Sequence, residues 1–534
     1  MPFADLVINA AVLTVDDAQP TAESIAVSGG RIVAVGDRSE VAPWIGPDTR
    51  TEDLGDACVM PGLVEAHGHP LMEAIVLSDR MVDIRPVTLP NADDVVAAIK
   101  GEIAARGAAG AYLNGWDALL QQGLPDPTLS WLDGIAPENP LVIIHNSGHK
   151  AYFNSAAAAR VGLTGDTPDP KGAKYGRRAD GSLDGSAEEI QAVFPLLQGA
   201  IQPSDYPTML RAELARLNRA GLTTCSEMAF DPGFRPVIDQ MRDDLTVRLR
   251  VYEMSTVAMT TDQVPDNGDD MFRQAGIKIW VDGSPWIGNI DLSFPYLDTA
   301  ATRVIGIPKG SCGCANYTRE QLTEIVGAYF PKGWQMACHV QGDAGADTIL
   351  DVYEEALRQH PREDHRLRLE HVGAIRDDQL QRAHDLGVTC SLFVDQIHYW
   401  GDIVVDGLFG PERGNRWMPC GSAVATGMRI SLHNDPPVTP EEPLRNISVA
   451  VTRTAPSGRV IGPEQRITVD QAIRAQTIDA AWQLHSDDVI GSLEVGKYAD
   501  MVVLSADPRT VPPEQIADLE VRATYLAGRQ VYGQ

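Results

Sequence analysis

The sequence predicts an α/β protein whose main part is a closed (β/α)8 TIM barrel, with a small β-sandwich formed from both chain termini and a long insertion after the first barrel strand. Three observations lead to this fold class. Strand-like apolar runs alternate with amphipathic helix patterns along the middle of the chain. β-Rich segments flank this region at both ends, and about 150 residues separate the first strand signal from the second. A doubly wound parallel sheet is the alternative.

The two chain ends share an alternation of short strands and turns. In the N-terminal part, strand-like runs cover residues 5–9, 11–15, 24–28 and 31–35, and Gly29-Gly30 marks a hairpin turn. In the C-terminal part, a turn and a strand lie within 491–504, and a hairpin lies within 521–532. We therefore expect one sandwich made of residues 1–60 and 489–534, around a barrel of residues 61–488.

Eight strand-like runs define the predicted barrel. The first ends at His67-Gly-His69, and the others cover 222–226, 246–252, 276–282, 335–340, 367–371, 388–393 and 429–433. Helix patterns fill several of the gaps, at 204–220, 319–330 and 343–358. The gap between the first two strands is too long for an ordinary connection. We interpret residues 75–215, approximately, as an insertion that roofs the mouth of the barrel.

Composition and charge bear on the partners and the location of the protein. The formal net charge is −29 and the pI about 4.7, which disfavours nucleic acids and anionic membranes as partners. The N-terminus shows no signal-peptide pattern, and no apolar run approaches the roughly 20 residues of a membrane span. Seven scattered cysteines predict reduced thiols in a cytoplasmic protein, with Cys312-Gly-Cys314 in a glycine-rich loop.

Metal-ligating residue types stand at the carboxyl ends of the predicted strands, where barrel enzymes carry their sites. His67 and His69 are two residues apart, so a strand presents both imidazoles on one side. His339, His371 and Asp435 follow strands five, six and eight. These are nitrogen and oxygen donors of the kind that zinc and similar ions accept.

The fourth predicted strand carries a lysine that faces the barrel interior. Lys278 alternates with isoleucines that face the surrounding helices. A buried lysine is costly unless its pKa falls or its chemistry is used. Asp282 lies on the same strand face and is the alternative ligand from this strand.

Taken together, these residues resemble the amidohydrolase superfamily of metal-dependent hydrolases, and most closely its YtcJ-like (amidohydrolase-3) branch. The similarity spans nearly the whole chain. The segments that carry it are 61–69, 278–284, 339–343, 370–371 and 434–438, with the terminal pieces 31–36 and 491–500. The usual Gly-Ser-Asp of the branch is here His433-Asn434-Asp435.

The resemblance implies a metal-binding role for each of these residues. His67 and His69 would bind the more buried metal and His339 and His371 the more exposed one. Lys278, carboxylated by carbon dioxide, would bridge them. Asp435 would touch the metal. The expected cofactor is a divalent ion, Zn²⁺ first, with one or two per chain; without carboxylation of Lys278 the site would hold one.

The resemblance also implies hydrolysis of a C–N bond other than a peptide bond, in an amide, N-formyl, N-acyl, carbamate or cyclic amide small molecule. A metal-bound hydroxide would attack the carbonyl, with Asp435 as general base and then acid and with His371 and His149 as further catalytic residues. The same centre in an ester or lactone hydrolase, a decarboxylase or an isomerase is the alternative. A non-enzymatic protein with a structural metal is disfavoured, because the ligands lie at an open barrel mouth.

Residues at the barrel mouth are the candidates for substrate contact: His149, Trp116, Trp286, His398 and His433. For His433, packing is an equally good interpretation, whereas aromatic residues in segments such as those of the two tryptophans more often pack in a core or lid. Glu65 and Glu370 precede ligand positions and are expected to hold neighbouring histidines. The partner is a small molecule, and the resemblance suggests a homodimer.

Overall fold

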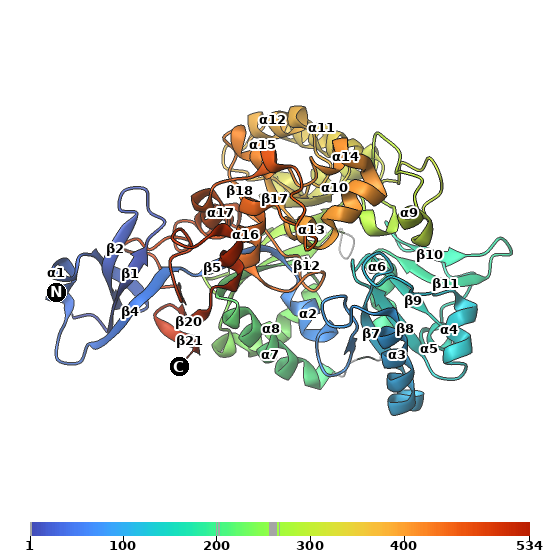
Figure 1. The fold of residues 1–534 in the computed structure, drawn as a ribbon, viewed down its shortest axis with the longest axis horizontal. Helices are drawn as coiled ribbons and strands as arrows, with labels where there is room; N and C mark the ends of the chain where they lie inside the picture. The colour runs from blue at the N-terminus through green and yellow to red at the C-terminus, as the bar shows by residue number, and fades with distance from the viewer. Residues whose placement is uncertain (1–2, 199, 201–202, 256–263, 266–267, 534) are drawn as a thin grey trace.

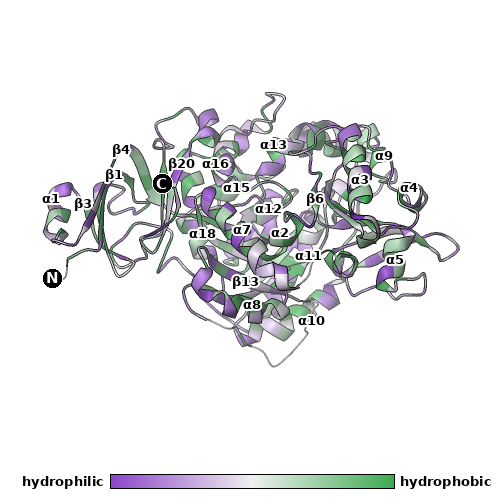
Figure 2. Cartoon of the chain, turned by 90° about the horizontal axis from the view of Figure 1, so that it is seen from below, coloured by the Kyte–Doolittle hydropathy of each residue, from purple (hydrophilic) through white to green (hydrophobic). Residues whose placement is uncertain are grey.

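The computed structural model describes residues 3–533 apart from 199, 201–202, 256–263 and 266–267. Three sheets follow one another along the long axis of the molecule, with a terminal sheet at one end, a barrel in the middle and an inserted sheet at the other end (Figure 1). The view from below shows the same order, with β1, β3 and β4 at one end and α3, α4 and α5 at the other (Figure 2).

Eight parallel strands form the barrel in chain order, and the last of them lies against the first. All eight predicted strands are confirmed, and the barrel, rather than a doubly wound sheet, is the fold. The strands are β5 (Leu63–Gly68), β12 (Leu222–Phe230), β13 (Arg248–Met254), β14 (Phe272–Trp280), β15 (Gln335–Val340), β16 (Arg368–His371), β17 (Thr389–Leu392) and β18 (Ile430–Leu432).

The three predicted helices are also present, as α7 (Tyr206–Arg219), α10 (Arg319–Tyr329) and α11 (Asp343–Gln359). In α7 the buried side chains include Leu210, Leu214 and Leu217, whose spacing places them on one face of a helix. This helix packs on α2 (Pro70–Val76), which begins directly after His69. None of the helices in the described part of the chain combines the length and apolar character needed to cross a bilayer.

The two chain termini come together, as predicted, and their strands form one seven-stranded sheet where a β-sandwich was expected. Its order is β21-β20-β19-β4-β1-β2-β3, and the antiparallel pairing of β19 with β4 joins the C-terminal part to the N-terminal part. The strands are β1 (Leu6–Leu13), β2 (Thr21–Ser28), β3 (Arg31–Gly36), β4 (Arg50–Pro61), β19 (Met501–Leu504), β20 (Val521–Leu526) and β21 (Arg529–Gly533).

Two details of this sheet differ from the prediction. The runs 5–9 and 11–15 form the single strand β1, whose register shifts between Asn9 and Val12, so an irregularity and not a turn separates them. β4 was not predicted, because its first seven residues are mostly exposed and polar and show no strand pattern. The terminal segment is fixed to the barrel by the buried ion pair between Arg248 and Asp500 (2.6 Å).

The segment between β5 and β12 has its own sheet and its own core. Six strands run in the order β10-β11-β9-β8-β7-β6, and α3 (Ala92–Arg106), α4 (Leu129–Ile135) and α5 (Ser155–Val161) pack around them (Figure 1). The strands are β6 (Val82–Asp83), β7 (Ala111–Trp116), β8 (Leu141–His145), β9 (Lys150–Phe153), β10 (Lys174–Arg177) and β11 (Leu183–Glu188). The apolar residues of β7 and β8, including Leu113 and Ile143, are fully buried between sheet and helices.

Candidate metal centre

The six predicted metal ligands lie around one cavity of about 90 Å³ at the carboxyl ends of the barrel strands. They come from five strand ends, which are far apart in the sequence and meet only because the barrel closes. His371 and Asp435 have positive φ angles of 72° and 54°, a conformation that costs energy for residues with a Cβ. The cavity is lined by His67, His69, Lys278, His339, His371 and Asp435, together with His149.

His67, His69 and Asp435 form the tightest group. The Nε2 atoms of His67 and His69 lie 3.5 Å and 3.3 Å from the same carboxylate oxygen, Oδ1 of Asp435. Asp435 Oδ2 is 3.9 Å from Nδ1 of His371. Nearby imidazoles and Lys278 outweigh burial and lower the pKa of Asp435, so the carboxylate form is favoured.

Two glutamates fix the outer nitrogens of this histidine pair. Nδ1 of His67 donates to Glu370 at 2.6 Å, and Nδ1 of His69 lies 3.3 Å from Glu227. Each ring thereby directs Nε2 inward, the arrangement of metal-binding histidines that rest on a carboxylate. The contact of Glu370 is the one expected from the sequence. Glu227 was missed, and its place near the end of the second barrel strand was the available signal.

Glu65 acts through the backbone instead. Its two oxygens accept hydrogen bonds from the N–H groups of His67 and Asn434, and the residue is buried. It therefore ties the first barrel strand to the segment that carries Asp435.

Lys278 reaches the same point from β14. Its Nζ lies 3.1 Å from Nε2 of His67, and its side chain is completely buried. Burial lowers the pKa of Lys278 to about 8, which increases the share of the neutral amine that reacts with carbon dioxide. Asp282, the alternative ligand, does not line the cavity, and its carboxylate accepts the backbone N–H groups of Gln341 and Gly342.

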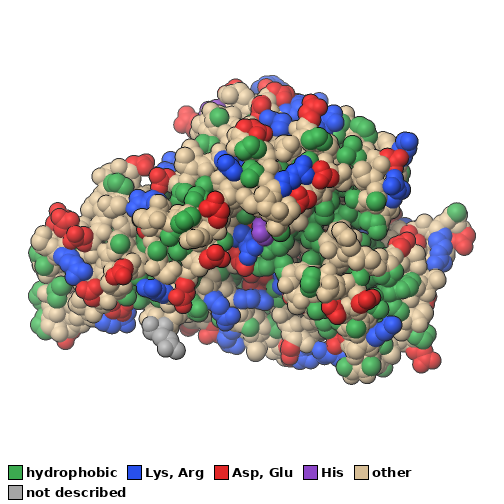
Figure 3. Space-filling view, in the orientation of Figure 1, with side chains coloured by type: hydrophobic (Ala, Val, Ile, Leu, Met, Phe, Trp, Pro, Cys, Tyr) green, Lys and Arg blue, Asp and Glu red, His purple; other side chains and the backbone are tan. Residues whose placement is uncertain are grey.

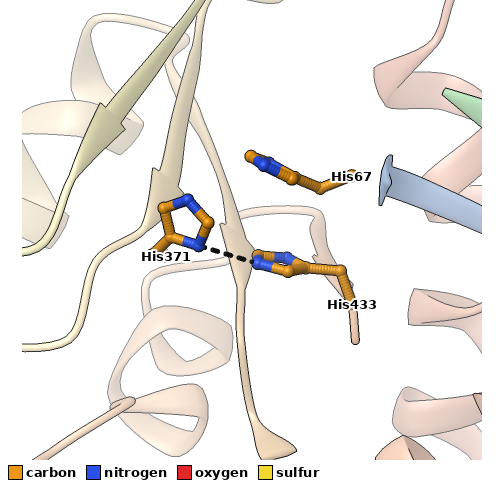
Figure 4. A group of neighbouring side chains, drawn as sticks. All are labelled: His67, His371 and His433. Carbon is orange, nitrogen blue, oxygen red and sulfur yellow. Dashed lines mark hydrogen bonds between the residues drawn. The ribbon is translucent and has the colours of Figure 1, made fainter. Parts of the chain in front are cut away.

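His433 does not line the cavity, and it lies beside His67 and His371 (Figure 4). Its Nε2 lies 3.0 Å from Nδ1 of His371, its ring stacks on His67 with centroids 4.7 Å apart, and Nδ1 pairs with Ser391. The side chain is buried and does not line the cavity, a placement that favours packing over substrate contact. One ring nitrogen from each of His67, His371 and His433 lies within 4.8 Å of the others, a second group able to hold an ion.

The donor chemistry of this centre fits a divalent metal. Burial, reinforced by neighbouring positive charge, holds the pKa values of His67, His339 and His371 well below the usual range, so these rings are neutral and have lone pairs to offer. For His339 the ring nitrogen left for a metal is Nδ1, because Nε2 donates to the carbonyl of Gly283 at 2.8 Å.

The inserted segment contributes His149, which follows β8. Its Nδ1 donates to Glu189 at 2.8 Å, and its ring lies 4.8 Å from that of His339, centroid to centroid. Burial opposes protonation, but the charge and hydrogen bond of Glu189 outweigh it and raise the pKa of His149. The sequence did not indicate Glu189.

Three predicted substrate contacts are absent from the cavity wall. Trp116 packs inside the inserted segment against Trp131 and Tyr152, and Trp286 stacks on Trp400 at 4.6 Å. His398 accepts a hydrogen bond from Arg445 outside the cavity. The structure therefore places these three side chains in packing contacts outside the cavity and not in its wall.

Apolar side chains make up most of the remaining wall. On the face seen in Figure 3, hydrophobic side chains gather between the barrel and the inserted sheet. The wall includes Met72, Val76, Ile144, Val193, Phe194, Leu197 and Trp280. Except for Trp280, all of these lie in the segment between β5 and β12, and none of them was predicted from the sequence as a wall residue.

Comparison with known proteins agrees with this geometry. A family model described as "Amidohydrolase family" matches residues 50–532. The N-substituted formamide deformylase of Arthrobacter pascens is 27% identical over 98% of this chain and 97% of its own length. The putative amidohydrolase YtcJ of Bacillus subtilis (strain 168) is 24% identical over 96% of both chains.

Among solved structures, an uncharacterized metal-dependent hydrolase from Pyrococcus horikoshii OT3 superposes with a TM-score of 0.73 at 23% identity. The alignment covers 95% of this chain and 99% of that one. At this identity the likeness concerns the fold.

Proposed function

The chain belongs to the amidohydrolase family, and from this premise we propose that it hydrolyses a C–N bond, in an N-formyl, N-acyl, carbamate or cyclic amide group of a small uncharged molecule. The observation that carries the proposal is the convergence of His67 Nε2 and His69 Nε2 on one oxygen of Asp435, with Lys278 beside them, inside a cavity.

The residues present fit a pair of divalent ions, Zn²⁺ first. His67, His69 and Asp435 would hold one, and His339 and His371 the other, with a carboxylated Lys278 between them. When bound, such ions polarise a carbonyl and make water acidic enough to react near neutral pH.

Asp435 is the proposed proton carrier. Its carboxylate lies at the centre of the group and stays ionised, so it accepts a proton from the attacking water. It then delivers this proton to the leaving nitrogen, which otherwise departs as a poor, anionic leaving group. His149 lines the same cavity and would donate to, or orient, the substrate carbonyl.

The cavity wall favours a neutral substrate with an apolar substituent. The apolar side chains from the insertion offer no partner for a charge, and among the described residues of the wall Lys278 is the only lysine or arginine. A charged substituent would lose its hydration there without compensation. The relative from Arthrobacter pascens is named for N-substituted formamides, which are neutral amides of this type.

The test is hydrolysis of a panel of N-alkyl and N-aryl formamides, acetamides, carbamates and cyclic amides, with esters and lactones alongside. Metal content is measured by elemental mass spectrometry on the same preparation. We expect two equivalents of metal and release of amine from a neutral amide. Turnover of esters or lactones alone, or an enzyme that binds no metal, would refute the proposal.

A further inference from the structure

Glu189 has a backbone conformation that is almost reserved for glycine. It lies between β11 and α6 (Ile190–Val193), with φ 68° and ψ 153°. The backbone of a residue with a Cβ is strained at such angles. Strain of this kind persists only where the surrounding contacts stabilise it, and it is common at functional sites. The side chain is buried, with the residue 4% exposed, and it points to the metal-centre cavity, whose wall it joins.

Both carboxylate oxygens of Glu189 have a directed partner. Oε2 accepts from Nδ1 of His149 at 2.8 Å, and Oε1 accepts from the amide of Asn289 at 2.9 Å. His149 and Glu189 belong to the inserted segment, whereas Asn289 belongs to the barrel loop after β14. Glu189 therefore joins the insertion to the barrel at the cavity.

Asn289 is itself fixed. Its Oδ1 accepts the N–H of Ser284 at 2.7 Å. It lies so close to Gly283 that a Cβ there would meet its amide at 2.4 Å. The carbonyl of Gly283 in turn accepts from Nε2 of His339. A continuous set of hydrogen bonds thus runs from His149 through Glu189 and Asn289 to the loop that holds a predicted metal ligand.

We propose that Glu189 is a positioning residue for hydrolysis: it accepts the Nδ1–H of His149 and thereby turns the Nε2–H of that ring toward the substrate carbonyl. Nε2 has no hydrogen-bond partner among the described residues, which leaves it available to a ligand. The insertion then completes the active site rather than only covering it. This inference rests on the proposed function, in which His149 faces the substrate.

The neighbouring residue provides a matched control. Glu188 ends β11, and its carboxylate pairs with Lys150 and Lys174 at 3.5 Å and 2.8 Å, away from the metal-centre cavity. Replacing either glutamate by glycine removes one carboxylate, but only at 189 does glycine also relieve a strained backbone.

The decisive variant is Glu189→Gly. We expect an unchanged metal content, a melting temperature equal to or above that of the wild type, and a kcat lower by about 10- to 100-fold, the usual effect of losing a carboxylate that orients a histidine. Glu188→Gly should lower the melting temperature and leave kcat near the wild-type value. A role of Glu189 in stability alone would lower the melting temperature of Glu189→Gly and leave kcat intact, which would overturn the inference.

Two measurements show whether Glu189 acts through His149. In the His149→Ala background, Glu189→Gly should lower kcat no further; a full second loss would refute the coupling. ¹⁵N NMR of histidine-labelled, metal-free protein, with His149→Ala for assignment, should show the His149 proton on Nδ1 in the wild type and not in Glu189→Gly. The NMR result needs no substrate, so it stands or falls separately from the proposed amide hydrolysis.

Discussion

Glu370 offers the sharpest test of the metal centre, because it touches a predicted ligand without facing the cavity. Its Oε2 lies 2.6 Å from Nδ1 of His67, and both oxygens face the guanidinium of Arg368, at 2.8 Å and 3.0 Å. All three side chains are essentially buried. The substitution Glu370→Gln keeps the size of the side chain, removes its charge, and places an amide N–H₂ among donors.

Two effects of known size should follow. Loss of the carboxylate behind a ligating histidine typically lowers metal affinity about 10- to 100-fold, which equals roughly 1.4 to 2.7 kcal/mol at about 1.4 kcal/mol per tenfold. Arg368 would keep only neutral partners, Tyr252 and the carbonyl of Ala66. Breaking a buried ion pair on one side costs about 3–5 kcal/mol of stability. We therefore expect a large loss of stability together with a moderate loss of metal affinity.

The assay is zinc titration of metal-free protein against a competing chelator, with chemical denaturation of the same samples. Glu363→Gln, at an exposed glutamate on the preceding loop, is the control and should match the wild type in both measurements. A folded Glu370→Gln variant that binds zinc as tightly as the wild type would contradict this reasoning. It would show that the contact of Glu370 with Nδ1 does not prepare Nε2 of His67 to bind the metal.

Other substitutions separate the remaining roles. Asp435→Asn should keep most of the metal while kcat falls by about 10²–10⁴-fold, the usual contribution of a positioned proton carrier. His67→Ala should lose metal and activity together. Equal metal loss in the two variants would contradict the role of Asp435 as proton carrier. Phe194→Ala should lower kcat/KM for an N-alkyl amide by about tenfold, because contact with an apolar side chain contributes about 1.5 kcal/mol. Trp286→Phe, outside the cavity, should leave KM unchanged. The reverse pattern in steady-state kinetics would contradict the assignment of Phe194, and not Trp286, to the cavity wall. Asp500→Asn leaves Arg248 buried beside a neutral group and should cost about 3–5 kcal/mol of stability in a denaturant titration, and an unchanged transition midpoint would show that this ion pair does not fix the terminal sheet.

The sequence predicted most of the residues that gather in the candidate metal centre, because each candidate ligand stands near a strand end. Apolar runs identify the strands, and the barrel architecture brings their carboxyl ends together. His67, His69, Lys278, His339 and Asp435 were therefore predictable residue by residue. The supporting glutamates were less predictable. Glu370 precedes His371 and was expected to hold a neighbouring histidine, whereas the available signal for Glu227 was its place directly after the predicted second strand.

The wall of the cavity was the hardest part to predict. Tryptophan is a reasonable candidate for substrate contact, yet Trp116 and Trp286 are buried in packing, because a large apolar ring gains most free energy where it excludes water completely. Phe194 and Leu197, which do line the cavity, lie in a segment with no distinctive pattern.

The sequence by itself determined the barrel and the joining of the two termini, because strand periodicity is a local property of the sequence. Its resemblance to the amidohydrolase family indicated a metal-dependent hydrolase. Only the tertiary structure decided which side chains meet. Glu189 shows the physical reason: its role comes from a strained backbone angle and from partners 40 and 100 residues away along the chain. His149 comes within hydrogen-bonding distance when the inserted sheet forms, because β11 pairs with β9. Asn289 does so only when that sheet packs against the barrel mouth.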